Sequence, residues 1–267
     1  MASAIQLYDL EHPRYAGAPQ IPTQPPGLIY NLHRRHEAGV PGGGTAASGL
    51  IITPDHAGTH IDALCHYAEN LELHGELRVD AQLQTSTGFT ALGAETIPAI
   101  VSPAVLLDVA AHRGVDRLPD GYAVTVDDLE AAAASERVTC DPGDVILVRT
   151  GNGSTWSDPD AYLRGPGMSA EASSWVVDRR ALAAGADNMA WDVIGRIDPT
   201  LNTALPGHLI LLARAGIYII ENLMLEELSR DRVYRFTLLC LPLKIRGATG
   251  SPVRPVALLA DGENREL

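Results

Sequence analysis

The sequence contains 267 residues, of which 46% are apolar and 20% charged, a composition typical of a folded globular domain and not of a disordered or fibrous chain. Its 33 acidic and 20 basic side chains give a formal net charge of −13, which repels nucleic-acid phosphates and anionic lipid head groups. We therefore expect a globular protein whose partners include a small molecule but neither nucleic acid nor a membrane.

Two further features indicate where the chain resides. Its longest apolar stretch, Leu209 to Ile220, is shorter than a membrane span and contains Arg214, and its first residues lack a basic start followed by an apolar core. The three cysteines are widely spaced and form no Cys-x-x-Cys pair, which favours reduced thiols. We expect a cytoplasmic protein.

The first part of the chain is dense in proline and glycine. Residues 13–49 include Pro25-Pro26 and Gly42-Gly43-Gly44 and show little periodicity, which predicts irregular structure. A segment of this length usually lines a site or covers a neighbour. We therefore expect residues 1–50 to form a loop-rich arm that contacts a neighbouring subunit.

A cluster of histidines follows, since His56, His60, His66 and His74 fall within nineteen positions. On a helix, His56 and His60 would share a face, but Asp62 would point to the far side. In an extended segment, positions 56, 58, 60 and 62 point the same way, with Gly58 adding no side chain between them. The spacing therefore predicts an extended segment whose three polar side chains converge on one ion.

Two imidazoles and a carboxylate suit zinc, manganese or iron, and three protein ligands leave a position open for water or substrate. His66 lies four residues beyond Asp62, close enough to act as a general acid or base. His74 falls outside this pattern, and we expect it at the surface. The alternative is that each of these side chains is an ordinary solvated or hydrogen-bonded residue.

After residue 100 the pattern becomes regular, and strands and helices alternate. Thr125 caps a helix, with Asp128 three residues on. The expected strands cover 104–109, 144–150, 217–220, 233–241 and 253–259, and the expected helical segments cover 125–135, 169–184, 205–215 and 225–229. Without internal repeats, this order predicts one α/β domain over residues 1–267.

Five residues outside the cluster are candidates for binding substrate. Aromatic residues are scarce, so Tyr30 and Trp191, together with Tyr67 and Trp156, are possible walls for a flat molecule. Arg149 ends the strand predicted at 144–150, where α/β sheets often place binding residues, and its guanidinium suits a carboxylate. The alternative for each is an ordinary core or surface role.

At the histidine cluster the sequence resembles the cyclase family, whose members include bacterial kynurenine formamidase and isatin hydrolase. Residues 56–66 match its pattern His-x-Gly-Thr-His-x-Asp-x-x-x-His at every fixed position. Later stretches are also similar, namely Gly185-Ala186-Asp187-Asn188, His208 to Glu221-Asn222-Leu223, and Leu241-Pro242-Leu243-Lys244 running into 250–254. The resemblance covers most of the chain.

This resemblance implies that His56, His60 and Asp62 hold one divalent metal, Mn²⁺ or Zn²⁺, with His66 as the catalytic histidine. In two-metal members, Asp62 would bridge to a second ion held also by His208 and Glu221. From the residues alone, His208 and Glu221 could instead face water at the ends of their elements. The implied fold is a mixed, barrel-like central sheet flanked by helices, of a swivelling β/β/α type, in a homo-oligomer such as a dimer or tetramer.

The predicted activity is metal-dependent hydrolysis of a C–N or C–O bond in a cyclic amide, an aryl formamide or a lactone. Kynurenine formamidases usually carry proline two residues after the motif aspartate, whereas this chain has Leu64, which makes it more similar to isatin hydrolase. Two alternatives stay open: a metal-dependent lyase or cyclase that dehydrates a polyketide-like or hydroxy-acid substrate, and a non-catalytic metal-binding protein.

Overall fold

The computed structural model describes residues 5–260; residues 1–4 and 261–267 of the predicted domain lie outside the described residues. A nine-stranded mixed sheet forms its centre, in the order β1-β17-β15-β9-β11-β13-β14-β4-β16. Four neighbouring strands in the middle, β9 to β14 in that order, run parallel, and the strands on either side pair antiparallel. The strands are β1 (Ile5–Asp9), β4 (His60–Asp62), β9 (Ile100–Asp108), β11 (Val145–Arg149), β13 (Ala183–Ala186), β14 (Tyr218–Glu221), β15 (Arg235–Cys240), β16 (Gly250–Pro252) and β17 (Val256–Ala260).

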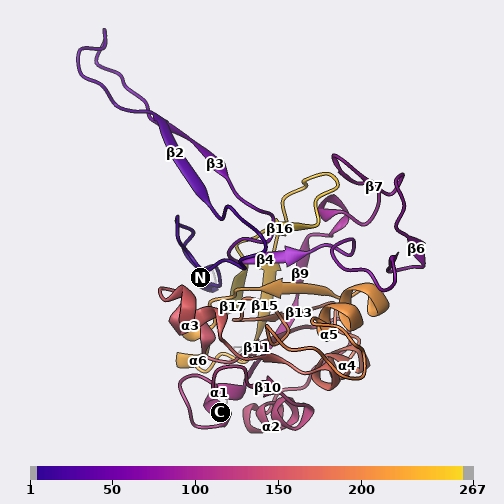
Figure 1. Ribbon diagram of the computed structural model, residues 1–267. Coiled ribbons are helices and arrows are strands. Elements are labelled where there is room, and N and C mark those ends of the chain that lie inside the picture. The colour runs from indigo at the N-terminus through magenta and orange to yellow at the C-terminus, as the bar shows by residue number, and fades with distance from the viewer. Residues whose placement is uncertain (1–4, 261–267) are drawn as a thin grey trace.

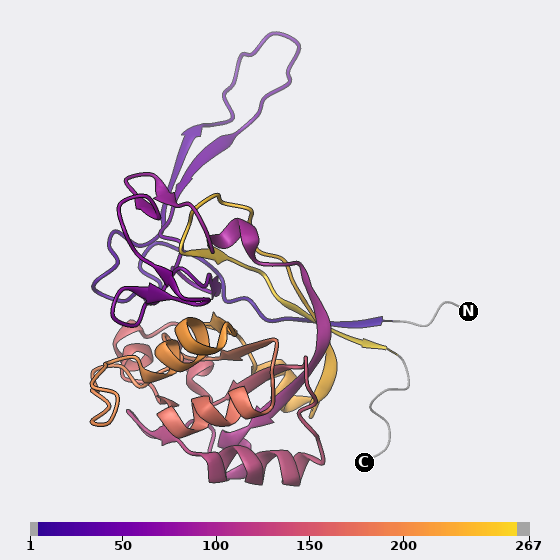
Figure 2. The same cartoon turned by 90° about the vertical axis from the view of Figure 1, so that its right-hand side faces the viewer.

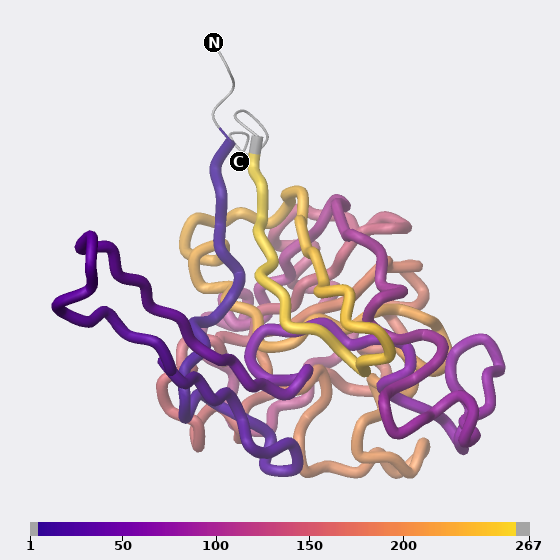
Figure 3. The backbone as a smooth tube through the Cα atoms, turned by 90° about the horizontal axis from the view of Figure 1, so that it is seen from above, coloured from indigo at the N-terminus to yellow at the C-terminus, as the bar shows by residue number. Residues whose placement is uncertain are grey.

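The sheet curls into a half-barrel with helices against it (Figures 1 and 2), which confirms the predicted fold class. At one edge, β1 and β17 run side by side (Figure 3). The helices are α1 (Val109–His112), α2 (Val126–Glu136), α3 (Pro159–Leu163), α4 (Ala170–Asp178), α5 (Pro206–His208), a π-helical segment (Leu209–Ala215) and α6 (Glu226–Arg230), with 3₁₀ turns at Ala94–Thr96 and Asn152–Thr155. Within residues 5–260, none of these helices is long and apolar enough to cross a bilayer.

Both faces of the parallel strands are buried, as is usual where helices cover a parallel sheet. Alternate residues of β9 and β11 enter opposite halves of the core. Leu106 and Leu147 pack in one half, and Leu107 and Ile146 in the other. The continuous apolar runs that predicted these two strands reflect this burial on two sides.

Most of the predicted elements are confirmed within a few residues. The five expected strands correspond to β9, β11, β14, β15 and β17, and the expected helices to α2, α5 with its π-helical extension, and α6. The Thr125 side chain accepts a hydrogen bond from the Asp128 amide, and Asp128 accepts one from the Thr125 amide, which is a capping box. Gly216, with φ +69°, ends the segment after α5.

The predicted helix over 169–184 is wrong in its second half. Helix α4 ends at Asp178, and Ala183–Ala186 forms the central strand β13 between β11 and β14. A Cβ atom on Gly185 would lie 2.8 and 2.9 Å from the side chains of Leu223 and Leu147. Small residues are needed here because neighbouring side chains close over the strand, and this packing overrides the helix propensity of alanine.

The expectation of irregular structure over 13–49 is also wrong in part. Strand β2 (Ile29–Arg34) pairs with β3 (Ser48–Ile52) in a hairpin that projects from the body of the molecule (Figure 1). The remaining short strand pairs are β5 (Glu72–Leu73) with β6 (Leu77–Arg78), β7 (Gln84–Thr85) with β8 (Gly88–Phe89), and β10 (Ala123–Val124) with β12 (Gly167–Met168). The isoleucines of β2 and β3 and Tyr30 favour strands.

Candidate metal centre

Two adjacent strands place three of the predicted ligands on one face of the sheet. His60 and Asp62 are two residues apart on β4, so their side chains point the same way. Glu221 lies directly opposite His60 in the antiparallel pair of β4 with β14. Nε2 of His60 is 3.4 Å from Oδ1 of Asp62 and 3.3 Å from Oε2 of Glu221, and all three side chains are buried.

His56 joins this group from a turn and not from a strand. The expected extended conformation is confirmed only for 60–62, because residues 56–59 bend and Gly58 has φ +63°. The Arg14 guanidinium donates hydrogen bonds to the carbonyls of Ala57 and Thr59, and a Cβ on Gly58 would lie 2.9 Å from it. The bend nevertheless brings Nδ1 of His56 to 2.8 Å from Oδ1 of Asp62, so the predicted convergence holds.

The last two cluster residues approach from other elements. His208, at the end of α5, places Nε2 3.5 Å from Oδ2 of Asp62 and 3.4 Å from Oε1 of Glu221. The His66 ring, just beyond β4, has its centroid 4.0 Å from that of His56 and 5.7 Å from that of His208. All six predicted metal and catalytic residues therefore lie together, and His208 and Glu221 do not face water.

Hydrogen bonds on the outer side fix which imidazole nitrogen faces the cluster. Nδ1 of His60 lies 2.7 Å from the carbonyl oxygen of Gly58, and Nδ1 of His208 lies 2.7 Å from Oδ2 of Asp192. Both acceptors require a hydrogen on Nδ1, so the Nε2 atoms of the neutral rings present lone pairs to the carboxylates. Sequence analysis missed Asp192 because no local spacing connects it with His208.

The His56 ring is turned the opposite way. Its Nε2 lies 2.9 Å from Oγ1 of Thr249, whose own hydrogen is donated to Oδ2 of Asp55 at 2.8 Å. Nε2 must therefore carry the ring hydrogen, which leaves the Nδ1 lone pair facing Asp62. Thr249 and Asp55 were also missed, and they are 194 positions apart in the sequence.

This arrangement fits a divalent cation. Neither carboxylate oxygen of Asp62 accepts a hydrogen bond from the described residues, although both are buried and imidazole nitrogens lie 2.8–3.5 Å away. Lone pairs of neutral imidazoles facing a buried carboxylate need positive charge between them. Imidazole and carboxylate are ligands that Zn²⁺ and Mn²⁺ accept. Two sets of ligand atoms lie within 4.8 Å of one another, His56–Asp62–His66 and His60–Asp62–Glu221, and both include Asp62.

The pKa values of His60 and His208 also indicate that the carboxylates of the cluster favour positive charge near them. Burial opposes protonation of His60, yet the carboxylates of Asp62 and Glu221, 3.4 and 3.3 Å from its Nε2, raise its pKa to about 10. Burial likewise opposes protonation of His208, but Asp192, Glu221 and Asp62 raise its pKa to about 9. Burial and the neighbouring histidines lower the pKa of His66 to about 3, despite the charge of Asp62, so His66 is a neutral imidazole.

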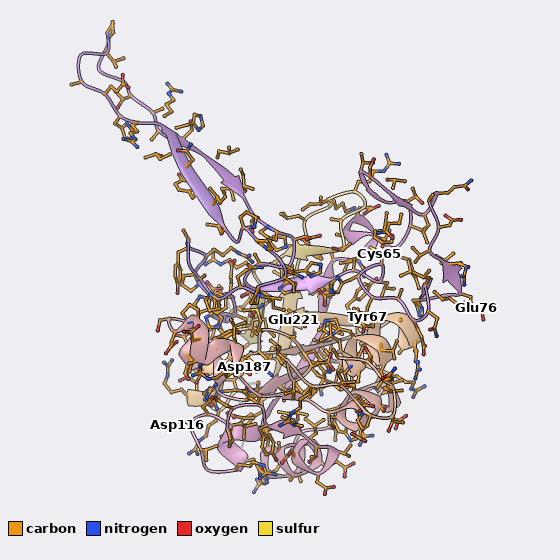
Figure 4. All side chains as sticks on the ribbon, in the orientation of Figure 1. Cys65, Tyr67, Glu76, Asp116, Asp187 and Glu221 are labelled. Carbon is orange, nitrogen blue, oxygen red and sulfur yellow. The ribbon has the colours of Figure 1, made fainter. Side chains whose placement is uncertain are left out.

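A cavity of about 550 Å³ opens onto the cluster. His56, His60, His66, His208 and Glu221 contribute to its wall, and Tyr67 lies beside them with its hydroxyl 2.6 Å from Oγ1 of Thr203. In Figure 4, Tyr67 and Glu221 lie below β4 in the body of the molecule. The volume suits a small organic molecule. Most of the remaining lining, including Ile21, Met189 and Ile194, was not identified from the sequence because it comes from loops.

Of the five residues predicted to bind substrate, Tyr67 lines this cavity, Trp156 is stacked on His12 and does not line it, and the other three do not line it either. Tyr30 is 57% exposed on the projecting β2–β3 hairpin. Arg149 is held by Asp108 and Glu226 at 2.8 and 2.6 Å, so its guanidinium is already paired. Trp191 is fully buried. Its backbone N–H donates a hydrogen bond to Oε1 of Glu221 at 2.7 Å and so orients that carboxylate. Within this chain, none of the three is placed to contact a molecule in the cavity.

Comparison with known proteins places this geometry in a family. The family model Cyclase matches residues 8–193. Kynurenine formamidase of Paracidovorax citrulli is 28% identical over 96% of this chain and 98% of its own length. A crystal structure of a novel cyclase has a TM-score of 0.83 and 29% identity, covering 94% of this chain and 86% of the other.

Isatin hydrolase A from Ralstonia solanacearum has a TM-score of 0.73 and 25% identity, covering 96% of this chain and 92% of the other. The formamidase and the isatin hydrolase are both hydrolases by name, and each matches nearly the whole chain. The chain therefore belongs to the Cyclase family and is a hydrolase.

Proposed function

We propose that the protein is a metal-dependent hydrolase that cleaves the C–N bond of an aryl formamide or a cyclic amide, or the C–O bond of a related lactone. The observation that carries this proposal is the set of imidazole lone pairs facing the unbonded carboxylate of Asp62 at one wall of a cavity. The names of the relatives, a kynurenine formamidase and an isatin hydrolase, support the amide class.

The ligands in this proposal are His56, His60, Asp62, His208 and Glu221, and the metal is Mn²⁺ or Zn²⁺. When bound, such an ion makes water more acidic and polarises a carbonyl oxygen. The set His60–Asp62–Glu221 supports one ion, and His56 and His208 approach the same Asp62 carboxylate at 2.8 and 3.5 Å. Asp192, Thr249 and the carbonyl of Gly58 orient the rings of His208, His56 and His60.

His66 is the residue proposed to move protons. Its imidazole is part of the cavity wall, next to His56, so a ring nitrogen is placed to accept a proton from the attacking water and return it to the leaving nitrogen or oxygen. Water adds to the carbonyl carbon, the C–N or C–O bond breaks, and the products are a carboxylic acid and an amine or alcohol.

We also propose that the protein is cytoplasmic and forms a homo-oligomer. The three cysteines are free, which supports a reducing compartment. The β2–β3 hairpin exposes the apolar side chains of Ile29, Tyr30, Leu32, Leu50, Ile51 and Ile52, and a protruding apolar hairpin of this kind is typical of a contact surface.

The proposal is tested by stripping the purified protein with a chelator, restoring Mn²⁺ or Zn²⁺, and measuring bound metal and turnover of formanilide, isatin and a small lactone. His60→Ala and Asp62→Ala should lose both metal and turnover. His112→Ala, an exposed histidine on α1, is the matched control and should lose neither. Full turnover in metal-free protein would contradict the proposal.

Two further outcomes identify the alternatives. A hydrolase must place one oxygen from ¹⁸O-labelled water in the new carboxylate, whereas a lyase that eliminates water leaves the label in solvent. Tight, stoichiometric metal binding without turnover of any substrate would instead favour a non-catalytic metal-binding protein.

A further inference from the structure

The residues that line the cavity fall into two chemically different groups, called here its two walls. One is the ligand cluster with Tyr67, and the other is almost entirely apolar. The apolar wall comes from three loop segments and consists of Ile21, Met189, Ala190, Ile194, Gly195, Ala204 and Leu205, with Thr23 and Gln24 as its polar members. A molecule that places a carbonyl at the cluster therefore places the rest of its surface against hydrocarbon.

The cavity offers no counter-charge for an anionic substituent. Among the described residues that line it, none is lysine or arginine, and the one acidic residue, Glu221, belongs to the cluster. Two arginines of the chain are held by other groups, since Arg14 donates to the carbonyls of Ala57 and Thr59 and Arg149 pairs with Asp108 and Glu226. Arg196, which follows Gly195 in the chain, is exposed and lines a different pocket. Thr23 and Gln24 supply hydrogen bonds but no charge.

The charge of the cluster acts in the same direction. Asp62 and Glu221 would supply the two negative charges that balance one divalent ion, so a site with one ion would offer no excess positive charge to a carboxylate elsewhere on a substrate. The formal net charge of −13 also opposes the approach of anions. Burying an unpaired carboxylate against an apolar wall is costly.

We infer that the substrate is uncharged outside its reacting carbonyl: a neutral aryl formamide, cyclic amide or lactone, and not one that carries a free carboxylate or an amino-acid group. This inference rests on the proposed hydrolase function and narrows it. The apolar wall acts as the specificity determinant, with Ile194 at the edge of the cavity, where its side chain is 40% exposed.

The first test compares matched substrates that differ in one charge. Formanilide and 4-formamidobenzoate share the same scissile bond, and isatin and isatin-5-sulfonate form a second pair. With metal-loaded protein we expect kcat/KM to be about 30-fold or more higher for the neutral member of each pair. Equal values, or a preference for the charged members, would overturn the inference while leaving the hydrolase function intact.

If the protein hydrolyses none of the four compounds, the result contradicts the proposed function and the inference with it. Failure of the proposed function is therefore distinguishable from failure of the inference alone. A binding measurement gives a readout besides turnover: by calorimetry, acetanilide should bind more tightly than 4-acetamidobenzoate. The reverse order would contradict the inference even in a protein that hydrolyses formanilide.

The second test adds the missing charge. Ile194→Arg should raise kcat/KM for 4-formamidobenzoate relative to formanilide by about fivefold or more. The matched control is Ile197→Arg, three residues along the same loop, 69% exposed and outside the lining of this cavity. If both variants change the two substrates equally, the apolar wall does not select for charge and the inference fails.

Discussion

Nδ1 of His208 lies 2.7 Å from Oδ2 of Asp192, and both side chains are buried. The same carboxylate accepts hydrogen bonds from the backbone amides of Gly207 and His208 at 2.6 and 3.2 Å. Asp192 therefore fixes both the start of α5 and the orientation of the ring that this helix presents to Asp62. Such carboxylate partners commonly govern the affinity of a metal-binding histidine.

Replacing Asp192 by asparagine tests this role. The amide keeps the size of the side chain but offers a single acceptor oxygen and no charge, so we expect affinity for Zn²⁺ or Mn²⁺ to fall by about 10- to 100-fold, measured by competition with a chromogenic chelator. Asp127→Asn, an exposed position on α2, is the control and should leave affinity unchanged. Wild-type affinity in Asp192→Asn would show that His208 is oriented without this hydrogen bond.

Gly58 gives a second prediction, because it combines a positive φ with a close neighbour. Gly58→Ala places a Cβ 2.9 Å from Nη1 of Arg14 at a backbone φ of +63°. Left-handed backbone costs an L-residue about 1–2 kcal/mol, and displacement of Arg14 adds to this. Gly114→Ala, at φ +69° with no atom within 4 Å of the added Cβ, measures the backbone cost alone.

We expect Gly58→Ala to lower the free energy of unfolding by more than Gly114→Ala in urea titrations, and to weaken metal binding as well, since His56 and His60 flank the bend. Equal losses in the two variants would mean that Arg14 moves aside freely and does not shape the ligand turn.

Four residues of the cluster could be predicted from their spacing because this information is local, whereas His208 and Glu221 were indicated only by the family resemblance. His56, His60, Asp62 and His66 fall within eleven residues, and their spacing alone indicated convergence on one ion. The conformation that achieves it was not predictable, because Arg14, more than forty positions away, bends the turn. The outer partners of the histidines were missed for the same reason.

The fold shows the same division between local and long-range causes. The cap of α2 depends on two residues three positions apart and was predicted correctly. The first two residues of strand β13, Ala183 and Ala184, were predicted as the end of a helix because alanine favours a helix by propensity, and packing between β11 and β14 makes them part of a strand. Arg149 was assigned to substrate because its partner Glu226 is 77 positions away.

The proposed self-association predicts an effect of charge on the hairpin. Ile51 is 64% exposed on β3, so Ile51→Lys leaves the folded chain intact but places a charge within the proposed contact. We expect sedimentation velocity to show a smaller species than wild type at equal concentration. Val101→Lys, at a position 63% exposed on β9, is the matched control and should sediment like wild type. A monomeric wild-type protein would refute the proposed contact.

A buried carboxylate away from the site gives a pH dependence of stability. Glu136 accepts a hydrogen bond from the Asp108 amide at 2.7 Å, while its Oε2 has no partner among the described residues. Burial, with the nearby charge of Asp108, raises the pKa of Glu136 to about 8 in spite of that hydrogen bond. The folded protein therefore holds this proton at neutral pH, whereas the unfolded chain has released it.

Between the unfolded pKa, 4.5, and about 8, the folded state binds more protons than the unfolded state, so the contribution of Glu136 to the free energy of unfolding falls as pH rises. Glu136→Gln removes this titration and keeps an acceptor for the Asp108 amide. We expect urea titrations to give a free energy of unfolding for the variant, minus that of wild type, that is larger at pH 8 than at pH 5. The increase should be a few kcal/mol. Glu37→Gln, at an exposed position, should leave the pH dependence unchanged. If Glu136→Gln shows the same decline as wild type between pH 5 and 8, Glu136 is ionised in the folded protein and its burial is compensated by a partner.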